Sequence, residues 1–222
     1  MSDRAAARLA WSMWTLCATF LCAVGAFRAL NWSTLRTEPR GPLVLDVGIL
    51  LLFLSFATVG ALVVSRQPRN SIGWIFCALG LLMPLAALGE EYALYALVTR
   101  PGTLPGAEVM VWLAVWVGGP TMISLLALVF LLFPNGRPPS RRWRPVVWVN
   151  LMAIALIFAW TFEPGTMENT VLPSVENPFG VAGAGALFEI LESAGFLLAL
   201  VGAVAGAVSL IVRLRRSRGD ER

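Results

Sequence analysis

Long apolar segments alternate with short polar segments along the whole chain. The apolar segments cover approximately residues 9–30, 43–65, 72–97, 109–133, 146–162 and 186–212. Each has about the 17 to 25 residues that an α-helix needs to cross the hydrocarbon core of a bilayer. The segments between them are rich in proline and glycine, as in residues 134–139, which is typical of turns. The pattern predicts an all-α integral membrane bundle of six transmembrane helices, with residues 1–222 forming a single polytopic domain.

The composition supports this prediction. The chain is 58% hydrophobic and 14% charged, with a mean hydropathy of +0.75, whereas soluble domains are about 45–50% apolar and about 25% charged. Such a surplus of apolar residues cannot fit inside one globular core, so part of it should face lipid. A cleaved secretory signal over residues 1–28 is disfavoured, because its apolar stretch is too long and Arg28 stands where small residues should precede the cleavage site.

The absence of two residue types excludes several kinds of chemistry. All 17 basic residues are arginine, and the sequence has neither lysine nor histidine. A Ser-His-Asp triad, a zinc-protease motif, a P-loop lysine and a Schiff-base lysine are therefore excluded. Cys17, Cys22 and Cys77 stand alone in apolar segments, without the spacing of a zinc site. We therefore expect no enzymatic activity, no cofactor and no metal site.

The arginines predict the orientation of the helices. The loops that carry most arginine normally stay in the cytoplasm. One side of the predicted bundle holds Arg4, Arg8, Arg66, Arg69, Arg137, Arg141, Arg142, Arg144, Arg213, Arg215, Arg216, Arg218 and Arg222. The other side holds only Arg28, Arg36, Arg40 and Arg100. Both termini are therefore expected in the cytoplasm, and most carboxylates fall on the opposite side.

That opposite, outer side carries the first candidate functional site. Its residues are Asp46, Glu90, Glu91, Tyr92, Tyr95, Trp112, Glu189 and Glu192. A rim of carboxylates could report external pH, bind a cation or recognise a cationic amphiphile, and the three aromatic residues could form a ligand cage. The alternative is that the carboxylates face headgroups and water while the aromatic residues anchor the bundle at the interface.

Two further features concern the helices themselves. Pro84 and the sequence Gly118-Gly119-Pro120 interrupt consecutive helices at matching depth, which predicts a hinge or a shared pocket. The alternative is the ordinary frequency of glycine and proline in membrane helices. Gly195, Gly202 and Gly206 give the last helix a face of small residues for close helix packing. The sequence leaves open whether the packing partner is in this chain or in a second copy.

One cytoplasmic loop is strongly basic. Arg137, Arg141, Arg142 and Arg144 lie within a few residues of one another. We expect them to contact anionic lipid headgroups and to fix the topology. The loop is too short for a folded nucleic-acid-binding surface, so no nucleic-acid partner is expected.

Several motifs occur in an order that resembles a known family. They are Arg66-Gln67-Pro68-Arg69-Asn70-Ser71-Ile72-Gly73-Trp74, Tyr92-Ala93-Leu94-Tyr95, residues 101–106, residues 132–137 with 140–145, Asn177-Pro178-Phe179-Gly180, and the tail 215–222. Together they cover roughly residues 43–222 and are similar to the membrane region of bacterial sensor histidine kinases and related membrane signalling proteins.

The resemblance implies a multi-helix input module in a bacterial cytoplasmic membrane. In the family, further membrane helices, a dimerising histidine and an ATP-binding domain follow this region. This chain ends at Arg222 and has no histidine, so kinase activity is not carried over. We expect a fragment, a separately encoded relative, or a module that works through a homodimer or a separate output protein.

The function expected from the sequence is therefore sensory input for signal transduction, without a catalytic output of its own. The main alternative is a small transporter or channel, since interrupted membrane helices often mark a substrate site. The two interruptions do not occupy corresponding positions in the two halves, however, and the middle of each span lacks ionisable residues. An intramembrane enzyme with a metal ion bound at the outer rim is a more distant alternative.

Overall fold

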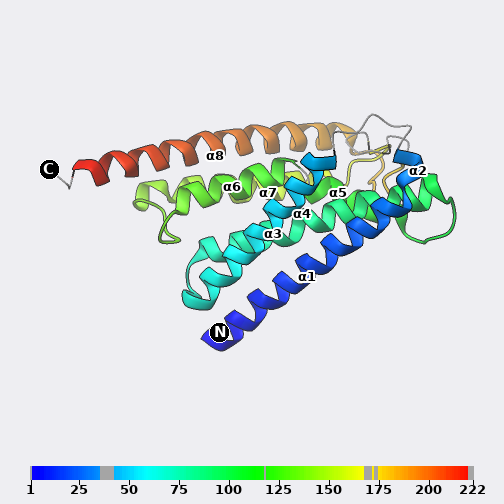
Figure 1. Cartoon of the computed structure of the whole chain (residues 1–222). Coiled ribbons are helices and arrows are strands. Elements are labelled where there is room, and N and C mark those ends of the chain that lie inside the picture. The colour runs from blue at the N-terminus through cyan, green and yellow to red at the C-terminus, as the bar shows by residue number, and fades with distance from the viewer. Residues whose placement is uncertain (1, 36–42, 118, 168–171, 173–174, 220–222) are drawn as a thin grey trace.

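The computed structural model describes residues 2–35, 43–117, 119–167, 172 and 175–219, and these are almost entirely helical. Figure 1 shows long helices running side by side between two ends of an elongated bundle. The elements are α1 (Asp3–Leu30), α2 (Trp32–Leu35), α3 (Leu43–Arg66), α4 (Ser71–Leu94), the π-helix η1 (Tyr95–Thr99), α5 (Ala107–Val117), α6 (Gly119–Leu132), the 3₁₀-helix η2 (Arg141–Trp143), α7 (Arg144–Trp160) and α8 (Gly185–Gly219).

Six helical segments of the described chain are long and apolar enough to cross a membrane. The prediction of an all-helical chain with six such segments is confirmed. Many large apolar side chains lie on the outside of the bundle, as Leu51, Ile190, Leu197 and Leu200 do. A lipid environment accommodates such a surface, whereas a water-soluble monomer rarely exposes so much contiguous apolar area.

Local capping explains where some helices begin. The Ser2 hydroxyl accepts a hydrogen bond from the Ala5 amide at 3.3 Å, so α1 begins well before the apolar segment predicted from residue 9. Asn70 caps α4 in the same way, through an oxygen that accepts from the Ile72 amide at 3.1 Å. Side-chain acceptors of this kind satisfy amides that have no partner inside the helix. An apolar segment in the sequence therefore predicts the part of a helix that can face lipid, but it does not predict where the helix begins or ends.

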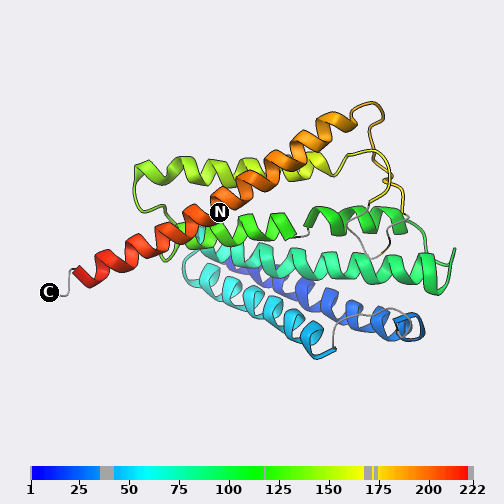
Figure 2. The ribbon, with the colours of Figure 1, turned by 90° about the horizontal axis from the view of Figure 1, so that it is seen from above.

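The helices pack in two groups joined through α4. Helices α1, α3 and α4 contact one another, helices α6, α7 and α8 form the second group, and α4 also contacts α5 and α6. Figure 2 shows α1, α3 and α4 along one side of the bundle, α7 along the other, and α8 running obliquely from the side of α7.

Glycine permits the closest helix contacts in both groups. A Cβ at Gly195 would lie 3.0 Å from Ile157 of α7, one at Gly202 would meet the Asn150 side chain of α7, and one at Gly206 would lie 2.8 Å from the Ala127 carbonyl of α6. The small-residue face of α8 therefore packs within this chain. A second set, Gly60, Gly73 and Gly80, brings α3 and α4 together and was not singled out in the sequence.

The two predicted hinge positions lie in α4, at Pro84, and at the junction of α5 and α6, at Gly118-Gly119-Pro120. Helix α4 continues through Pro84, whose side chain is buried, and departs from α geometry only at the π-helix Tyr95–Thr99. In the segment predicted as one helix over 109–133, the described residues form α5 and α6 on either side of Gly118. Gly118 and the side chain of Pro120 lie outside the described residues.

A hydroxyl compensates for the proline in α6. Pro120 has no N–H to donate to the carbonyl four residues earlier, that of Trp116. The Thr121 hydroxyl donates to this carbonyl at 2.8 Å. A backbone acceptor that the proline deprives of its usual donor is thus satisfied inside the apolar bundle.

The two ends of the bundle differ in charge. We call the end formed by the first turn of α1, residues 66–71, residues 133–144 and the last turns of α8 the basic end. The end formed by residues 31–35, 95–106, 161–167 and 175–184 is the acidic end. Arg4, Arg66, Arg69, Arg137 and Arg142 belong to the basic end. The first and last described turns of the chain both lie at this end (Figure 1), as predicted for an even number of spans.

Candidate functional site

The predicted rim carboxylates differ in exposure. Glu90 and Glu189 are exposed, Glu192 is half-buried, and Glu91 is only 3% exposed. The side chain of Asp46 lies outside the described residues. Glu91 therefore does not face solvent, as a carboxylate of an exposed rim would.

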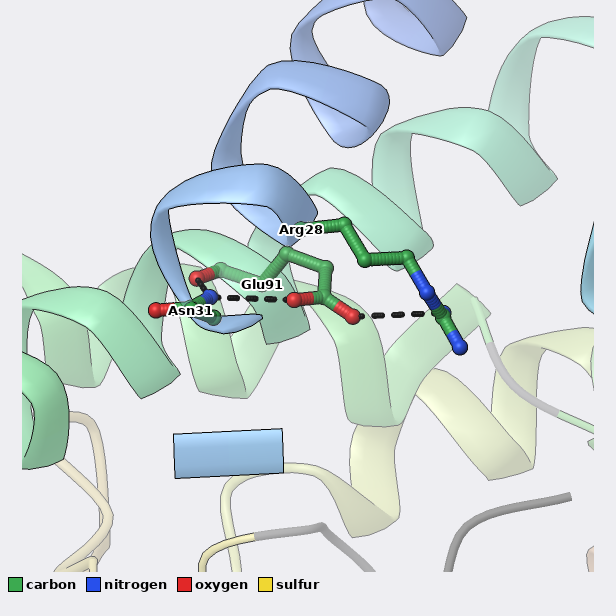
Figure 3. A network of polar contacts seen from close by, with 3 residues as sticks. All are labelled: Arg28, Asn31 and Glu91. Carbon is green, nitrogen blue, oxygen red and sulfur yellow. Dashed lines mark hydrogen bonds and ion pairs between the residues drawn. The ribbon is translucent and has the colours of Figure 1, made fainter. Parts of the chain in front are cut away.

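Glu91 is buried because α1 supplies partners for it. Its carboxylate lies 3.4 Å from the Arg28 guanidinium and accepts a hydrogen bond at 3.0 Å from the Asn31 amide, as Figure 3 shows. The same Asn31 amide donates to the Glu91 backbone carbonyl at 2.9 Å. Asn31 is fully buried, and its oxygen accepts from the Thr99 hydroxyl at 2.7 Å. This network joins the last turn of α1 to α4 and η1.

The three residues of the predicted aromatic cage have different ring neighbours. The rings of Tyr92 and Tyr95 both pack edge-on against Phe27 of α1, with centroids 5.4 and 5.7 Å away. Trp112 instead packs against Phe162 and Phe179, at 5.7 and 4.9 Å. Tyr92 and Trp112 nevertheless pack against the same hydrophobic cluster, which includes Ala93, Ala96 and Val111.

A pocket of about 480 Å³ lies at the acidic end between α5, α7, α8 and the segment after α7. Its walls are Val115, Trp160, Thr161, Glu163, Pro164, Gly165, Thr166, Met167, Asn177 and Glu192. Two carboxylates face this pocket from different elements. Glu163 follows the end of α7 and accepts a hydrogen bond from the Trp160 indole at 2.8 Å, whereas Glu192 comes from α8.

Asn177 holds the wall of this acidic-end pocket in place. Its amide donates to the carbonyls of Thr161 and Glu163, at 2.8 and 2.7 Å, and its oxygen accepts from the Phe179 amide at 3.0 Å. The Trp112 indole also donates to the Thr161 carbonyl, at 2.8 Å. These bonds fix residues 161–165 against residues 177–181 without a regular secondary structure.

Glycine lets the two segments approach. A Cβ at Gly180 would lie 2.9 Å from the Pro164 Cα atom. Asn177 and Gly180 belong to the motif Asn177-Pro178-Phe179-Gly180, which resembles a motif of a known family, and the structure gives both residues a positioning role. Glu163 was missed as a site residue because its partner in the pocket, Glu192, lies on another helix and no local spacing connects them.

The basic end contains a different polar arrangement. The Arg213 guanidinium on α8 donates to the carbonyls of Leu131, at 3.0 Å, of Arg137, at 2.8 Å, and of Phe133. These are carbonyls at the end of α6 and in the following turn, where a helix leaves acceptors unsatisfied. Arg141, Arg142 and Arg144 are exposed beside this turn, and Arg137 lines a recess at the same end.

No three histidine, cysteine, aspartate or glutamate side chains within the described ranges lie close enough together to hold a metal ion. The acidic-end pocket contains two carboxylates, an indole and several carbonyls, so it can receive a cationic or hydrogen-bond-donating group. The described residues give it no nucleophile activated by a base.

Comparison of the chain with protein-family models, with curated proteins and with solved structures gave no match in any of the three.

Replacing Asn177 by alanine should loosen the wall of the pocket. The variant loses two donated hydrogen bonds and one accepted bond, and two half-buried carbonyls lose a donor, which together should cost about 2–3 kcal/mol. Hydrogen exchange should then accelerate at the amides of Met167 and Val181, which bond across this region. The matched variant Asn135→Ala, in the exposed turn at the basic end, should leave those amides unchanged. Unaltered exchange in Asn177→Ala would contradict the assigned role.

Proposed function

We propose that the chain is a membrane-embedded sensory module that binds a cationic stimulus in the acidic-end pocket and transmits it along α8 to the basic end. The observation that carries the proposal is that α8 is one unbroken helix, contributing Glu192 to the pocket and Arg213 to the basic end. The proposal places the basic end in the cytoplasm of a bacterium, in agreement with the distribution of arginine.

The lining of the pocket supports a cationic ligand. Two carboxylates and an indole line a space large enough for a small organic molecule. Opposite charges attract, so the two carboxylates favour a cation over an anion in this space. Asn177 holds one wall of the pocket, and Glu192 of α8 belongs to another. A ligand that contacts both walls would therefore stabilise one position of α8 relative to another.

The length of α8 supports transmission. Glu192 and Arg213 are 21 positions apart, which corresponds to about 31 Å along an α-helix and is close to the thickness of the hydrocarbon core, about 30 Å. At its far end, Arg213 bonds the carbonyls of the turn after α6. A small shift or rotation of α8 at the pocket would therefore strain or release this turn. We propose that a second copy of the chain or a separate output protein reads that change.

Spin labels at the basic end test this transmission. The native cysteines Cys17, Cys22 and Cys77 are replaced by alanine, and labels are attached to Arg215→Cys and Arg141→Cys, both of which are exposed. The distance distribution between the labels is measured on the full chain in lipid nanodiscs, with Ca²⁺, spermidine or dodecyltrimethylammonium as probe cations. We expect at least one of these cations to shift the distance distribution. In Glu192→Gln, the cation concentration that gives half of this shift should be about tenfold or more higher.

Glu189→Gln is the matched control. Glu189 lies three residues before Glu192 on the same helix but is exposed and does not line the pocket. Its variant should keep most of the response of the parent. A distribution unchanged by all three cations, or a response lost equally in both variants, would contradict the proposal. Accumulation of a probe cation inside proteoliposomes would instead favour the transporter alternative.

A further inference from the structure

A second recess, of about 390 Å³, lies at the basic end of the bundle. Three separate segments line it: the first turn of α1, the turn between α3 and α4, and the turn after α6. Its residues are Asp3, Gln67, Pro68, Arg69, Asn70, Asn135 and Arg137. It shares none of these residues with the acidic-end pocket, and the sensory role proposed above does not use it.

Hydrogen bonds between the turns build this recess. The Asn70 side chain is only 9% exposed, and its amide donates to the Gln67 side chain at 3.1 Å and to the Pro134 carbonyl at 3.3 Å. The Trp74 indole of α4 donates to the Pro68 carbonyl at 2.9 Å and so fixes the turn between α3 and α4. The shape of the recess therefore depends on part-buried hydrogen bonds around Asn70, and not on unbonded surface side chains alone.

Gly136 allows the two turns to meet. Its φ of +69° lies in the left-handed region, which side chains disfavour, and a Cβ there would lie 2.6 Å from the Asn70 oxygen and 2.7 Å from the Ser71 amide nitrogen. The turn after α6 can come this close to the start of α4 only with glycine at this position. Residues far apart in the sequence are thus held at fixed positions around one space.

The charges in the recess are of both signs. Arg69 and Arg137 bring two exposed guanidinium groups from different turns, and neither has a hydrogen-bond or ion-pair partner for that group within the described part of the chain. Two guanidinium groups and nearby amides are suited to a phosphate. Asp3 places one carboxylate in the same lining, which disfavours a simple anion but suits a ligand that also carries an ammonium group.

We propose that this recess binds the headgroup of a phospholipid with a primary ammonium group, of the phosphoethanolamine type. Arg69 and Arg137 bind the phosphate, and Asp3 accepts a hydrogen bond from the ammonium. The basic end of a membrane-spanning bundle lies at headgroup depth, so such a lipid can enter while its acyl chains remain beside the helices. The site requires that the chain spans a membrane, but it does not depend on the sensory role.

Native mass spectrometry of the full chain in detergent tests the site, because it resolves individual bound lipids by mass. Phosphatidylethanolamine, phosphatidylglycerol and phosphatidylcholine with identical acyl chains are titrated against the parent and three variants. Arg69→Gln with Arg137→Gln removes both phosphate ligands. Arg141→Gln with Arg142→Gln removes the same charge at the same end of the bundle but outside the recess. Asp3→Asn removes the carboxylate.

The expected results differ between these variants. In the parent, the first phosphatidylethanolamine binds more tightly than phosphatidylcholine, whose methylated ammonium cannot donate a hydrogen bond. The double variant Arg69→Gln with Arg137→Gln should bind phosphatidylethanolamine about tenfold or more weakly. The double variant Arg141→Gln with Arg142→Gln should bind it as the parent does. Asp3→Asn should remove the preference over phosphatidylcholine. Circular dichroism and Tm measurements establish that each variant is folded.

Three outcomes would overturn the proposal. Equal losses in the two arginine pairs would mean that binding follows the overall surface charge. Phosphatidylglycerol binding as tightly as phosphatidylethanolamine, with no effect of Asp3→Asn, would mean that only the anion is recognised. Inorganic phosphate that raises Tm as much as the lipid does, and that competes with it, would identify a soluble anion as the ligand.

Discussion

Glu91→Leu should destabilise the bundle by about 3–5 kcal/mol, the largest effect we expect from a single side chain. Leucine has a similar volume but removes the carboxylate that lies 3.4 Å from the Arg28 guanidinium, and it removes one of the two acceptors of the buried Asn31 amide. Removing one partner of a buried ion pair is costly because the other charge stays in a poorly hydrated site. For a chain of this size, the loss corresponds to a decrease in Tm of about 10 °C or more.

Two further variants separate this effect from others. Glu90→Leu makes the same change one residue earlier, at an exposed position, and should lower Tm much less than Glu91→Leu does. Arg28→Met combined with Glu91→Leu should recover part of the loss, because the charge that faces Glu91 is then removed as well. Tm is measured in one detergent and lipid mixture throughout. Equal Tm values for Glu90→Leu and Glu91→Leu would show that the contact with α1 contributes nothing.

Gly80→Ala should destabilise the contact between α3 and α4 by about 2–3 kcal/mol, although alanine normally favours a helix. The added Cβ would lie 2.6 Å from both the Cβ and the backbone nitrogen of Ala57, and 2.7 Å from its Cα. No side-chain rotation relieves a clash with backbone atoms. The two helices must therefore separate along this stretch, and other contacts of α3 with α4 weaken with them.

Gly25→Ala is the opposite case and the control for this prediction. Nothing lies within 4 Å of a Cβ built on Gly25 in α1, so the variant should gain about 0.5–1 kcal/mol from helix propensity alone. The same substitution should thus lower Tm at one position and raise it at the other. A change of the same sign at both glycines would contradict the close approach of α3 and α4.

The sequence predicts the spans of this fold well because they depend on one local property. A membrane helix must be apolar over about 20 residues, and this can be read without knowing its neighbours. Helix ends are predicted less well. Ser2 and Asn70 begin helices through single side-chain hydrogen bonds, and the π-helix at Tyr95–Thr99 has no signal in the apolar pattern.

The contacts between helices are harder to predict, because lipid-facing and buried surfaces of a membrane helix are both apolar. For this reason the prediction from the sequence placed Glu91 with Glu90 and Glu189 in one outer rim, although contact with α1 buries Glu91. The proposed cage also placed Tyr92 with Trp112, whose rings pack against different aromatic side chains. Gly60, Gly73 and Gly80 differ in no local respect from glycines that contact nothing, and only the position of the neighbouring helix distinguishes them.

The candidate site is predictable in part. Glu192 was identified from its place near the start of the last helix, and it does line a pocket. Glu163 and Asn177 were not identified, because they reach the pocket through a segment between helices whose shape depends on hydrogen bonds over 14 to 16 residues. No periodicity describes such a segment. The recess around Arg69 and Arg137 joins turns more than 60 residues apart and is equally invisible in the sequence.

The grouping of α1 with α3 and α4 has a consequence for biosynthesis. The contacts within this group all lie in roughly the first hundred residues, including the network between Asn31 and Glu91 and the glycine contacts of Gly60 and Gly80. These helices can associate while the ribosome is still translating the remainder, as domains do when they fold in order of synthesis. Helices α6, α7 and α8 would then be added to a partner that is already assembled, with α4 as the surface on which they dock.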